Sequence, residues 1–251
     1  MPNNLPALPV NAFSSSVMGR DHVAFHKNNQ DSFQVYCTED GAYGVALVCD
    51  GCGSGNRSEV GAHLTSAFLA KQIFVLLQLN PAQDLELLVR RTMTGLIEHL
   101  RAVASWVAFG PIPPEDVALV QQAPDPTQFI REHLFATVVG FLWRHDEGLL
   151  LQMGDGSYCC GSDVVVTEQE NAPHYPGYHI LDPVKDMHLD VRPFKPSEVR
   201  QVAVATDGFH PELYPDALKS RSSTELKLFL NVSQRKGFCH DDATIAIGKW
   251  C

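Results

Sequence analysis

The stretch Val45-Ala46-Leu47-Val48-Cys49-Asp50-Gly51 joins a run of apolar residues to an aspartate and a glycine. Its length and its Val and Leu content predict a buried β-strand that ends at Asp50. The same arrangement returns in Val202-Ala203-Val204-Ala205-Thr206-Asp207-Gly208. A carboxylate directly after a buried strand is held rigidly, and the glycine lets the backbone carbonyl approach a cation. Both stretches therefore predict ligands for a hard metal ion.

Two further aspartates fit the same chemistry. They are Asp31 in Asn29-Gln30-Asp31 and Asp241 in His240-Asp241-Asp242-Ala243-Thr244-Ile245. Only folding can gather acids spread so widely along the chain, and gathering like charges without a cation would force some of them to protonate. Oxygen ligands favour Mg²⁺ or Mn²⁺ over zinc, which prefers His and Cys. A metal-dependent hydrolase is the leading hypothesis.

Composition narrows the class of protein. The chain has 251 residues, of which 45% are hydrophobic, and we expect residues 1–251 to form one domain. A formal charge of -10 without a dense basic run disfavours nucleic-acid binding. The seven cysteines lack framework spacing, and residues 1–10 lack a secretory signal pattern, so free thiols in a reducing cytoplasm are expected. Apolar stretches fall short of the roughly 20 residues that span a bilayer, and no membrane association is expected.

The order of predicted elements favours an α+β fold. A helix is expected over 58–79, and a second from the Asn80-Pro81-Ala82-Gln83 capping pattern to about Trp106. A Pro-rich surface excursion follows at about 110–126. Short strands come next, and one helix capped at Ser222 or Ser223 ends before Gly237. The expected strands are 135–143, 149–153, 164–167, 202–206 and 243–248. This order predicts helices layered on antiparallel sheets.

The ordered set of acidic motifs resembles the PPM (protein phosphatase 2C) family. The set comprises Asn29-Gln30-Asp31, Asp50-Gly51-x-Gly53-Ser54, Gly154-Asp155-Gly156, Thr206-Asp207-Gly208 and Asp241-Asp242-Ala243-Thr244. It covers residues 19–248 and is far more specific than any single member. The resemblance implies a four-layer α-β-β-α sandwich of two antiparallel sheets flanked by helices. It also implies hydrolysis of phosphoserine and phosphothreonine with two Mn²⁺ or Mg²⁺ ions, and a third in some members.

The resemblance also implies roles for individual residues. Asp50 would bridge two metals, the Gly51 carbonyl would bind the second, and Asp207 and Asp241 would bind the first. Asp31 would orient the water.

A third, weaker metal would lie at Asp155 together with Asp207. Asp241 is favoured over Asp242 as the direct ligand, because Asn often occupies the position of Asp242 in the family. The implied mechanism is attack on phosphorus, in line, by a hydroxide that bridges the metals. The implied partners are a phosphorylated Ser/Thr protein and a cognate kinase system.

This chain departs from the family pattern at the phosphate grip. Many members carry an arginine five residues before the position of Asp31, where this chain has His26. A bacterial branch that opens with a glycine, a nearby histidine and Gln-Asp is closer, and Gly19, His22 and Gln30-Asp31 are similar to that opening. His22 and His26 are therefore candidate phosphate contacts, as are two neighbouring cations, Arg20 and Lys27.

Cys52 is a second departure, because some eukaryotic members have a general-acid histidine there. One hypothesis is that Cys52 is an oxidation-sensitive neighbour of the site. It is to be abandoned if Cys52→Ser leaves the peroxide sensitivity of the activity unchanged. The spacing Cys49-x-x-Cys52 alone favours a strand residue beside a loop over a redox pair. Cys159 and Cys160 are expected to alternate as one core and one surface thiol.

Three other interpretations stay open. Zinc at His22 and His26 would need a helix, whereas the segment looks extended or loop-like. A catalytically weak phosphatase-fold regulator or phosphoprotein-binding module would explain His26 in place of arginine. Hydrolysis of a small phosphomonoester is the third, because no peptide groove is visible in the sequence. Turnover of a phosphopeptide separates the enzyme from the regulator, and preference for peptides over small phosphates separates the two enzymes.

Overall fold

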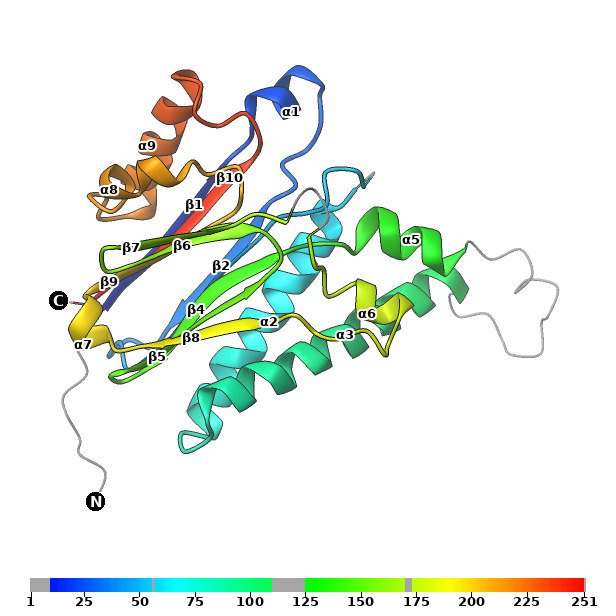
Figure 1. Ribbon diagram of the computed structural model, residues 1–251, viewed down its shortest axis with the longest axis horizontal. Coiled ribbons are helices and arrows are strands. Elements are labelled where there is room, and N and C mark those ends of the chain that lie inside the picture. Colours follow the sequence, from blue (N-terminus) through cyan, green and yellow to red (C-terminus); the bar gives the residue numbers. More distant parts are fainter. Residues whose placement is uncertain (1–9, 56, 110–124, 170–172, 251) are drawn as a thin grey trace.

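Two antiparallel sheets of five strands face each other, with helices on both outer faces (Figure 1). The computed structural model describes residues 10–55, 57–109, 125–169 and 173–250. The first sheet has the order β1-β10-β9-β6-β7, with bounds Val10–Val17, Ala243–Trp250, Gln201–Ala205, Gly156–Cys160 and Asp163–Thr167. The second has the order β2-β3-β4-β5-β8, with bounds Ser32–Cys37, Tyr43–Cys49, Val138–Arg144, Glu147–Met153 and Asp190–Phe194.

The long helices form the outer layers. α2 (Glu59–Leu79) packs on β2 and β3, and α3 (Leu85–Phe109) packs on α2. On the other side of the sandwich, α9 (Ser223–Arg235) packs against β1 (Figure 1). The shorter elements are α1 (Arg20–Ala24), α5 (Pro126–His133), α6 (Tyr178–Leu181), α7 (Pro196–Val199), the 3₁₀ turn η1 (Pro211–Leu213) and α8 (Tyr214–Ala217).

Three apolar layers hold the sandwich together. The central layer lies between the sheets, where Val48 and Phe141 of the second sheet join Val204 and Ala246 of the first. Alternate residues of β3, such as Leu47, point the other way into the layer beneath α2 and α3. Because both faces of β3 are covered, its sequence is a continuous apolar run rather than an alternating one. The predicted four-layer α-β-β-α sandwich is confirmed.

Among the described residues, α2 is the one helix long and apolar enough to cross a membrane by length and composition. Its buried residues, including Leu69, Ile73 and Leu77, belong to the apolar layer between the helices and the second sheet. This is the arrangement of a core helix. The expectation that the protein makes no membrane contact stays a prediction.

The second helix begins later than its capping pattern predicted. Asn80 ends α2, with its N–H bonded to the carbonyl of Leu76 at 2.9 Å, so it cannot start the next helix. Asp84 takes that role, since its carboxylate accepts the N–H of Leu87 at 2.8 Å. The predicted helix start at Ser222 is confirmed, because its hydroxyl accepts the N–H of Glu225 at 3.3 Å.

The Pro-rich excursion predicted at about 110–126 lies outside the described residues up to 124. Its last two residues belong to the next helix. Asp125 caps α5 by accepting the N–H of Thr127 at 2.8 Å, and Pro126 is the first helical residue.

The prediction of one core and one surface thiol at Cys159 and Cys160 was wrong, because both are buried. β6 is covered on its two faces, so Cys159 enters the layer beneath α8 and α9 while Cys160 enters the central layer. The six described cysteines are free, as expected.

Gly44 on β3 offers a direct test of the central packing. A Cβ at this position would lie 2.1 Å from Cζ2 of Trp143, whose indole N–H donates to the carbonyl of Gly41 at 2.9 Å. We expect Gly44→Ala to lower the free energy of unfolding by about 1–3 kcal/mol, since a buried indole must shift. Urea unfolding followed by circular dichroism measures the change.

Gly95→Ala is the matched control, because the nearest atom to its added Cβ would be 3.6 Å away, on Phe68. Gly95 lies inside α3, where alanine is the better helix former by up to about 1 kcal/mol. Equal destabilisation by the two substitutions would contradict this account of the packing.

Candidate metal centre

Five acids lie at strand ends in two neighbouring sheets. In the second sheet, Asp31 directly precedes β2 and Asp50 directly follows β3, and Ser32 is paired with Cys49. In the first sheet, Asp207 follows β9 by two residues and Asp241 precedes β10 by two. The fifth acid, Asp155, lies in the turn between β5 and β6. Antiparallel pairing of these strands thus gathers acids that are far apart in the sequence.

Hydrogen bonds tie the two sheets together at this point. Thr206, directly after β9 of the first sheet, donates its hydroxyl hydrogen to Oδ2 of Asp31 at 2.8 Å. The same hydroxyl accepts the N–H of Thr244 at 3.0 Å, which fixes its direction. Asp50 is held by its backbone, because its N–H donates to the Thr137 hydroxyl at 3.1 Å and its carbonyl accepts the Thr137 N–H at 2.8 Å.

The carboxylates are arranged as a cation would require. Oδ1 of Asp31 is buried and has no hydrogen-bond donor. Burial raises the pKa of Asp31 well above its ordinary value. Burial also raises the pKa of Asp50, and the charges of Asp31 and Asp207 add to that effect. An unpartnered carboxylate oxygen beside other acids is costly unless a cation or a proton compensates it, so an oxygen-only site of this kind fits Mg²⁺ or Mn²⁺.

Asp207 and Asp155 also have raised pKa values and belong to the same group of acids. Burial raises the pKa of Asp207 to about 6, with further contributions from the charges of Asp155 and Asp241. Burial raises the pKa of Asp155 as well. Asp155, Asp207 and Asp241 line one cleft of about 560 Å³. The acids that the sequence singled out therefore interact electrostatically around one place.

Gly51 occupies a crowded position. A Cβ there would lie 2.7 Å from the backbone of Ser58, at the start of α2. Its N–H donates to the carbonyl of Gln30 at 3.2 Å, and the residue forms an isolated bridge with Ala136. Glycine is thus required for packing beside Asp50. The role of its carbonyl as a metal ligand stays a prediction.

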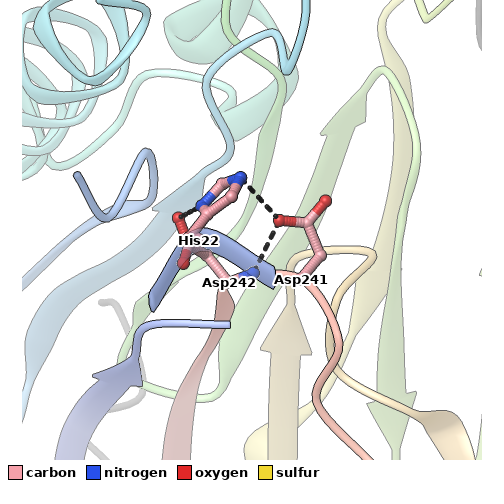
Figure 2. Close-up of side chains that lie close together, drawn as sticks. All are labelled: His22, Asp241 and Asp242. Carbon is pink, nitrogen blue, oxygen red and sulfur yellow. Dashed lines mark hydrogen bonds and ion pairs between the residues drawn. The ribbon is translucent and has the colours of Figure 1, made fainter. Parts of the chain in front are cut away.

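His22, Asp241 and Asp242 form a compact group whose ligand atoms all lie within 4.8 Å of one another (Figure 2). Asp242 is buried, and its carboxylate accepts the N–H of Gly19 at 2.7 Å and of Gln30 at 2.5 Å. Nδ1 of His22 lies 2.8 Å from the same carboxylate. By contrast, the Asp241 side chain is 61% exposed and lines the cleft. The geometry therefore leaves Asp241 free to bind a ligand and commits Asp242 to the fold.

The amino-acid sequence matches the model of one protein family. Residues 18–240 match the family described as protein phosphatase 2C. The chain belongs to the protein phosphatase 2C family. This membership makes it a phosphoprotein phosphatase, as the resemblance of its motifs implied. No curated protein matches the chain in sequence.

Solved structures, among them two serine/threonine phosphatases, share the fold. The serine/threonine phosphatase Stp1 from Staphylococcus aureus is 12% identical, with a TM-score of 0.59 over 96% of this chain and 94% of its own. The catalytic domain of the serine/threonine phosphatase PstP, in complex with two manganese ions, is 16% identical, with a TM-score of 0.58 over 96% and 97%. RsbX in complex with magnesium is 13% identical, with a TM-score of 0.52 over 96% of each chain.

The segment that carries His22 and His26 was predicted to be extended or loop-like, but part of it is helical. It contains the short helix α1, whose start is fixed because the N–H groups of Arg20 and Asp21 donate to the carbonyls of Cys239 and His240 at 3.3 and 3.1 Å. His22 is buried, whereas His26 lies beyond the helix end with a positive φ of 56° and is exposed.

This geometry bears on the two candidate phosphate contacts. Nδ1 of His22 faces Asp242, and Nε2 lies 3.4 Å from Oδ1 of Asp241, so both ring nitrogens already face carboxylates (Figure 2). His22 is thus placed to orient Asp241. The exposed His26 keeps its ring accessible. Phosphate contact by either residue stays a prediction.

The sequence did not predict that Asp242 and two glycines, Gly19 and Gly208, pack closely together at the site. A Cβ on Gly208 would lie 2.0 Å from the carbonyl oxygen of Asp242, and a Cβ on Gly19 would lie 2.3 Å from the carbonyl carbon of Asp241. Gly208 therefore serves close backbone packing, which the argument from carbonyl approach to a cation did not foresee. The available signal was the pair Asp241-Asp242 before an apolar strand, because one of two adjacent side chains must face inward.

Asp242 should be far more important for stability than its neighbour. We expect Asp242→Ala to lower the free energy of unfolding by about 3–5 kcal/mol, because it leaves two buried N–H groups and His22 without their partner. Asp241→Ala, the matched control, should change it by less than about 1 kcal/mol, since the Asp241 side chain is largely exposed. Urea unfolding of both variants in EDTA measures the difference. Similar losses in the two variants would contradict the assignment.

The raised pKa of Asp207 gives a pH-dependent stability. With a pKa of about 6 in the folded state against 3.8 ordinarily, the folded protein holds a proton that the unfolded chain has released. This contribution to metal-free stability therefore falls as pH rises from about 4 to 6 and stays low above that. We expect Asp207→Asn to raise the melting temperature in EDTA at pH 8 by roughly 2–4 °C, because the variant has no charge to bury at this position. This range is smaller than the full pKa shift would give, since solvent screens part of the charge. The gain should vanish near pH 4.5.

Asp216→Asn is the control for the loss of one charge. Asp216 lies on α8 and forms an exposed ion pair with Lys219 at 2.6 Å, and its charge is not among those that raise the pKa of Asp207. It should give no gain at pH 8. A melting temperature for Asp207→Asn at or below that of the wild type at pH 8 would overturn the electrostatic account.

Proposed function

We propose that this chain is a metal-dependent protein phosphatase that hydrolyses phosphoserine and phosphothreonine. The observation that carries the proposal is the buried, donorless Oδ1 of Asp31 beside Asp50, in a group of acids whose charges raise one another's pKa values. A regulator without chemistry has no physical need for such a costly arrangement. Family membership supports phosphorylated protein as the substrate class.

The proposed metal ligands are the side chains of Asp50, Asp207 and Asp241 and the Gly51 carbonyl. Asp155 with Asp207 would hold a third ion. Manganese and magnesium in two of the related structures support divalent cations here. When bound, such cations lower the pKa of a coordinated water and neutralise charge on the phosphoryl oxygens.

The chain itself would orient the reactants. Thr206 occupies Oδ2 of Asp31, which leaves Oδ1 to accept a hydrogen bond from the attacking water. His22 lies between Asp242 and Asp241, so it restricts the directions that the Asp241 carboxylate can take. These contacts support an Asp31 carboxylate held on one sheet and an Asp241 carboxylate held on the other, and groups held in place in advance lower the entropic cost of the reaction.

The proposal includes the setting of the enzyme. Residues 1–251 are proposed to act as one catalytic domain in a reducing cytoplasm, and the six free cysteines of the described part support this. The alternative, a catalytically weak regulator, draws on the replacement of the family's arginine by His26. Catalysis on a phosphopeptide distinguishes the two.

The activity should require both the cation and the acids. We expect wild-type protein to hydrolyse a phosphothreonine peptide with Mn²⁺ or Mg²⁺ and to lose the activity in EDTA. Asp50→Asn and Asp207→Asn should each reduce kcat by about 10²–10³-fold or more, since they remove charge that faces the cation. Phosphate release measures turnover, and Asp216→Asn serves as the control for charge. A folded wild-type protein without turnover under any metal condition would favour the regulator instead.

A further inference from the structure

A second cleft, of about 500 Å³, opens beside the metal centre. Its lining includes Cys52 and Ser54 from the loop after β3, Arg131 from α5, and Tyr175, Tyr178 and Lys185 from the segment around α6. None of these residues carries a role in the hydrolysis proposed above. The cleft combines aromatic walls with two cations, a composition that differs from that of the cleft lined by Asp155, Asp207 and Asp241.

The cleft adjoins the metal centre through the loop after β3. Cys52 directly follows Gly51, and its N–H donates to the carbonyl of Phe135 at 3.0 Å. Tyr175 and Cys52 both line the cleft. Burial raises the pKa of Tyr175, as do the neighbouring Cys52 and the charges of Asp50 and Asp155. Tyr175 therefore lies within electrostatic reach of the acids, and a peptide bound at the centre would pass close to this cleft.

Aromatic packing makes the wall of the cleft rigid. Phe135 stacks on Tyr175 with ring centroids 5.2 Å apart and meets Tyr178 edge-on at 4.6 Å. Nζ of Lys185 lies 4.3 Å from the centre of the Tyr178 ring. This cation–π contact holds the ammonium group over the cleft without neutralising it.

The two cations are available to a ligand. Arg131 and Lys185 are exposed, and within the described part of the chain neither forms an ion pair with an acid. Asp182 also lines the cleft, where its carboxylate faces the N–H of Val184 at 3.3 Å. Two cations against one acid leave a positive local charge, although the chain as a whole carries -10. A concentrated positive site on an acidic protein is suited to selecting an anion.

We propose that this cleft binds a carboxylate side chain of the substrate peptide that flanks the phosphorylated residue, with Arg131 and Lys185 as its specificity-determining contacts. The inference rests on the proposed phosphatase function. The aromatic wall would pack against the methylene groups of a glutamate, and the cations would pair with its carboxylate. The protein would then prefer phosphorylated residues in acidic sequence contexts.

The test compares three phosphothreonine peptides that differ only in flanking residues, which are glutamate, glutamine or lysine. Wild-type protein with Mn²⁺ should show a kcat/KM ratio of roughly 3–10 for the glutamate over the glutamine peptide, mainly through KM, and the ratio should shrink at high salt. The double variant Arg131→Gln/Lys185→Gln should bring the ratio to about 1. The reversed variant Arg131→Glu/Lys185→Glu should favour the lysine peptide.

Lys71→Gln/Arg91→Gln is the matched control, because it removes the same charges from exposed positions on α2 and α3 and should keep the wild-type ratio. A wild-type enzyme that hydrolyses the peptides without preference would overturn the inference and leave the proposed function standing. An unchanged preference in both cleft variants would overturn it in the same way. No turnover of any peptide or of p-nitrophenyl phosphate by the wild type would overturn the proposed function and this inference with it.

Discussion

The structure depends on the burial of like-charged carboxylates where its two sheets meet. Asp31 and Asp50 come from one sheet and Asp207 and Asp241 from the other, and burial raises the pKa of three of them. Such a group opposes folding unless protons or cations compensate it. The hydrogen bond from Thr206 to Asp31 links the sheets at this point. A divalent cation would therefore stabilise the fold and supply the chemistry at one site.

Asp242 explains how this strained group stays in place. Its buried carboxylate binds the backbone N–H groups of Gly19 and Gln30 and the ring of His22, so the start of α1 and the segment before β2 both meet the segment before β10. Gly208 allows the backbone of the Asp207 loop to reach the same strand end. Asp31 directly follows Gln30, and Asp241 directly precedes Asp242. The contacts of Asp242 therefore position acids of both sheets. In this dipeptide, the exposed Asp241 is thus available for the chemistry and the buried Asp242 holds the structure.

Much of this could be predicted from the sequence. The apolar runs before Asp50 and Asp207 specify β3 and β9, and the order of the acidic motifs indicates the family. The strand β1, with three consecutive serines, lacks that hydrophobic signal and is specified by its pairing with β10. The start of α3 was misplaced because Asn80 served the end of one helix instead of the start of another. The burial of His22 and the charged cleft depend on contacts between distant segments, which local patterns do not encode.

The most direct test is a calorimetric titration of the metal-free wild-type protein with Mn²⁺ near pH 6, in two buffers with different ionisation enthalpies. If buried carboxylates with raised pKa values form the site, binding should release protons, and the melting temperature should rise with Mn²⁺ concentration. Asp207→Asn should weaken both effects. Absence of binding, or binding without proton release, would contradict the claim that a cation compensates these acids.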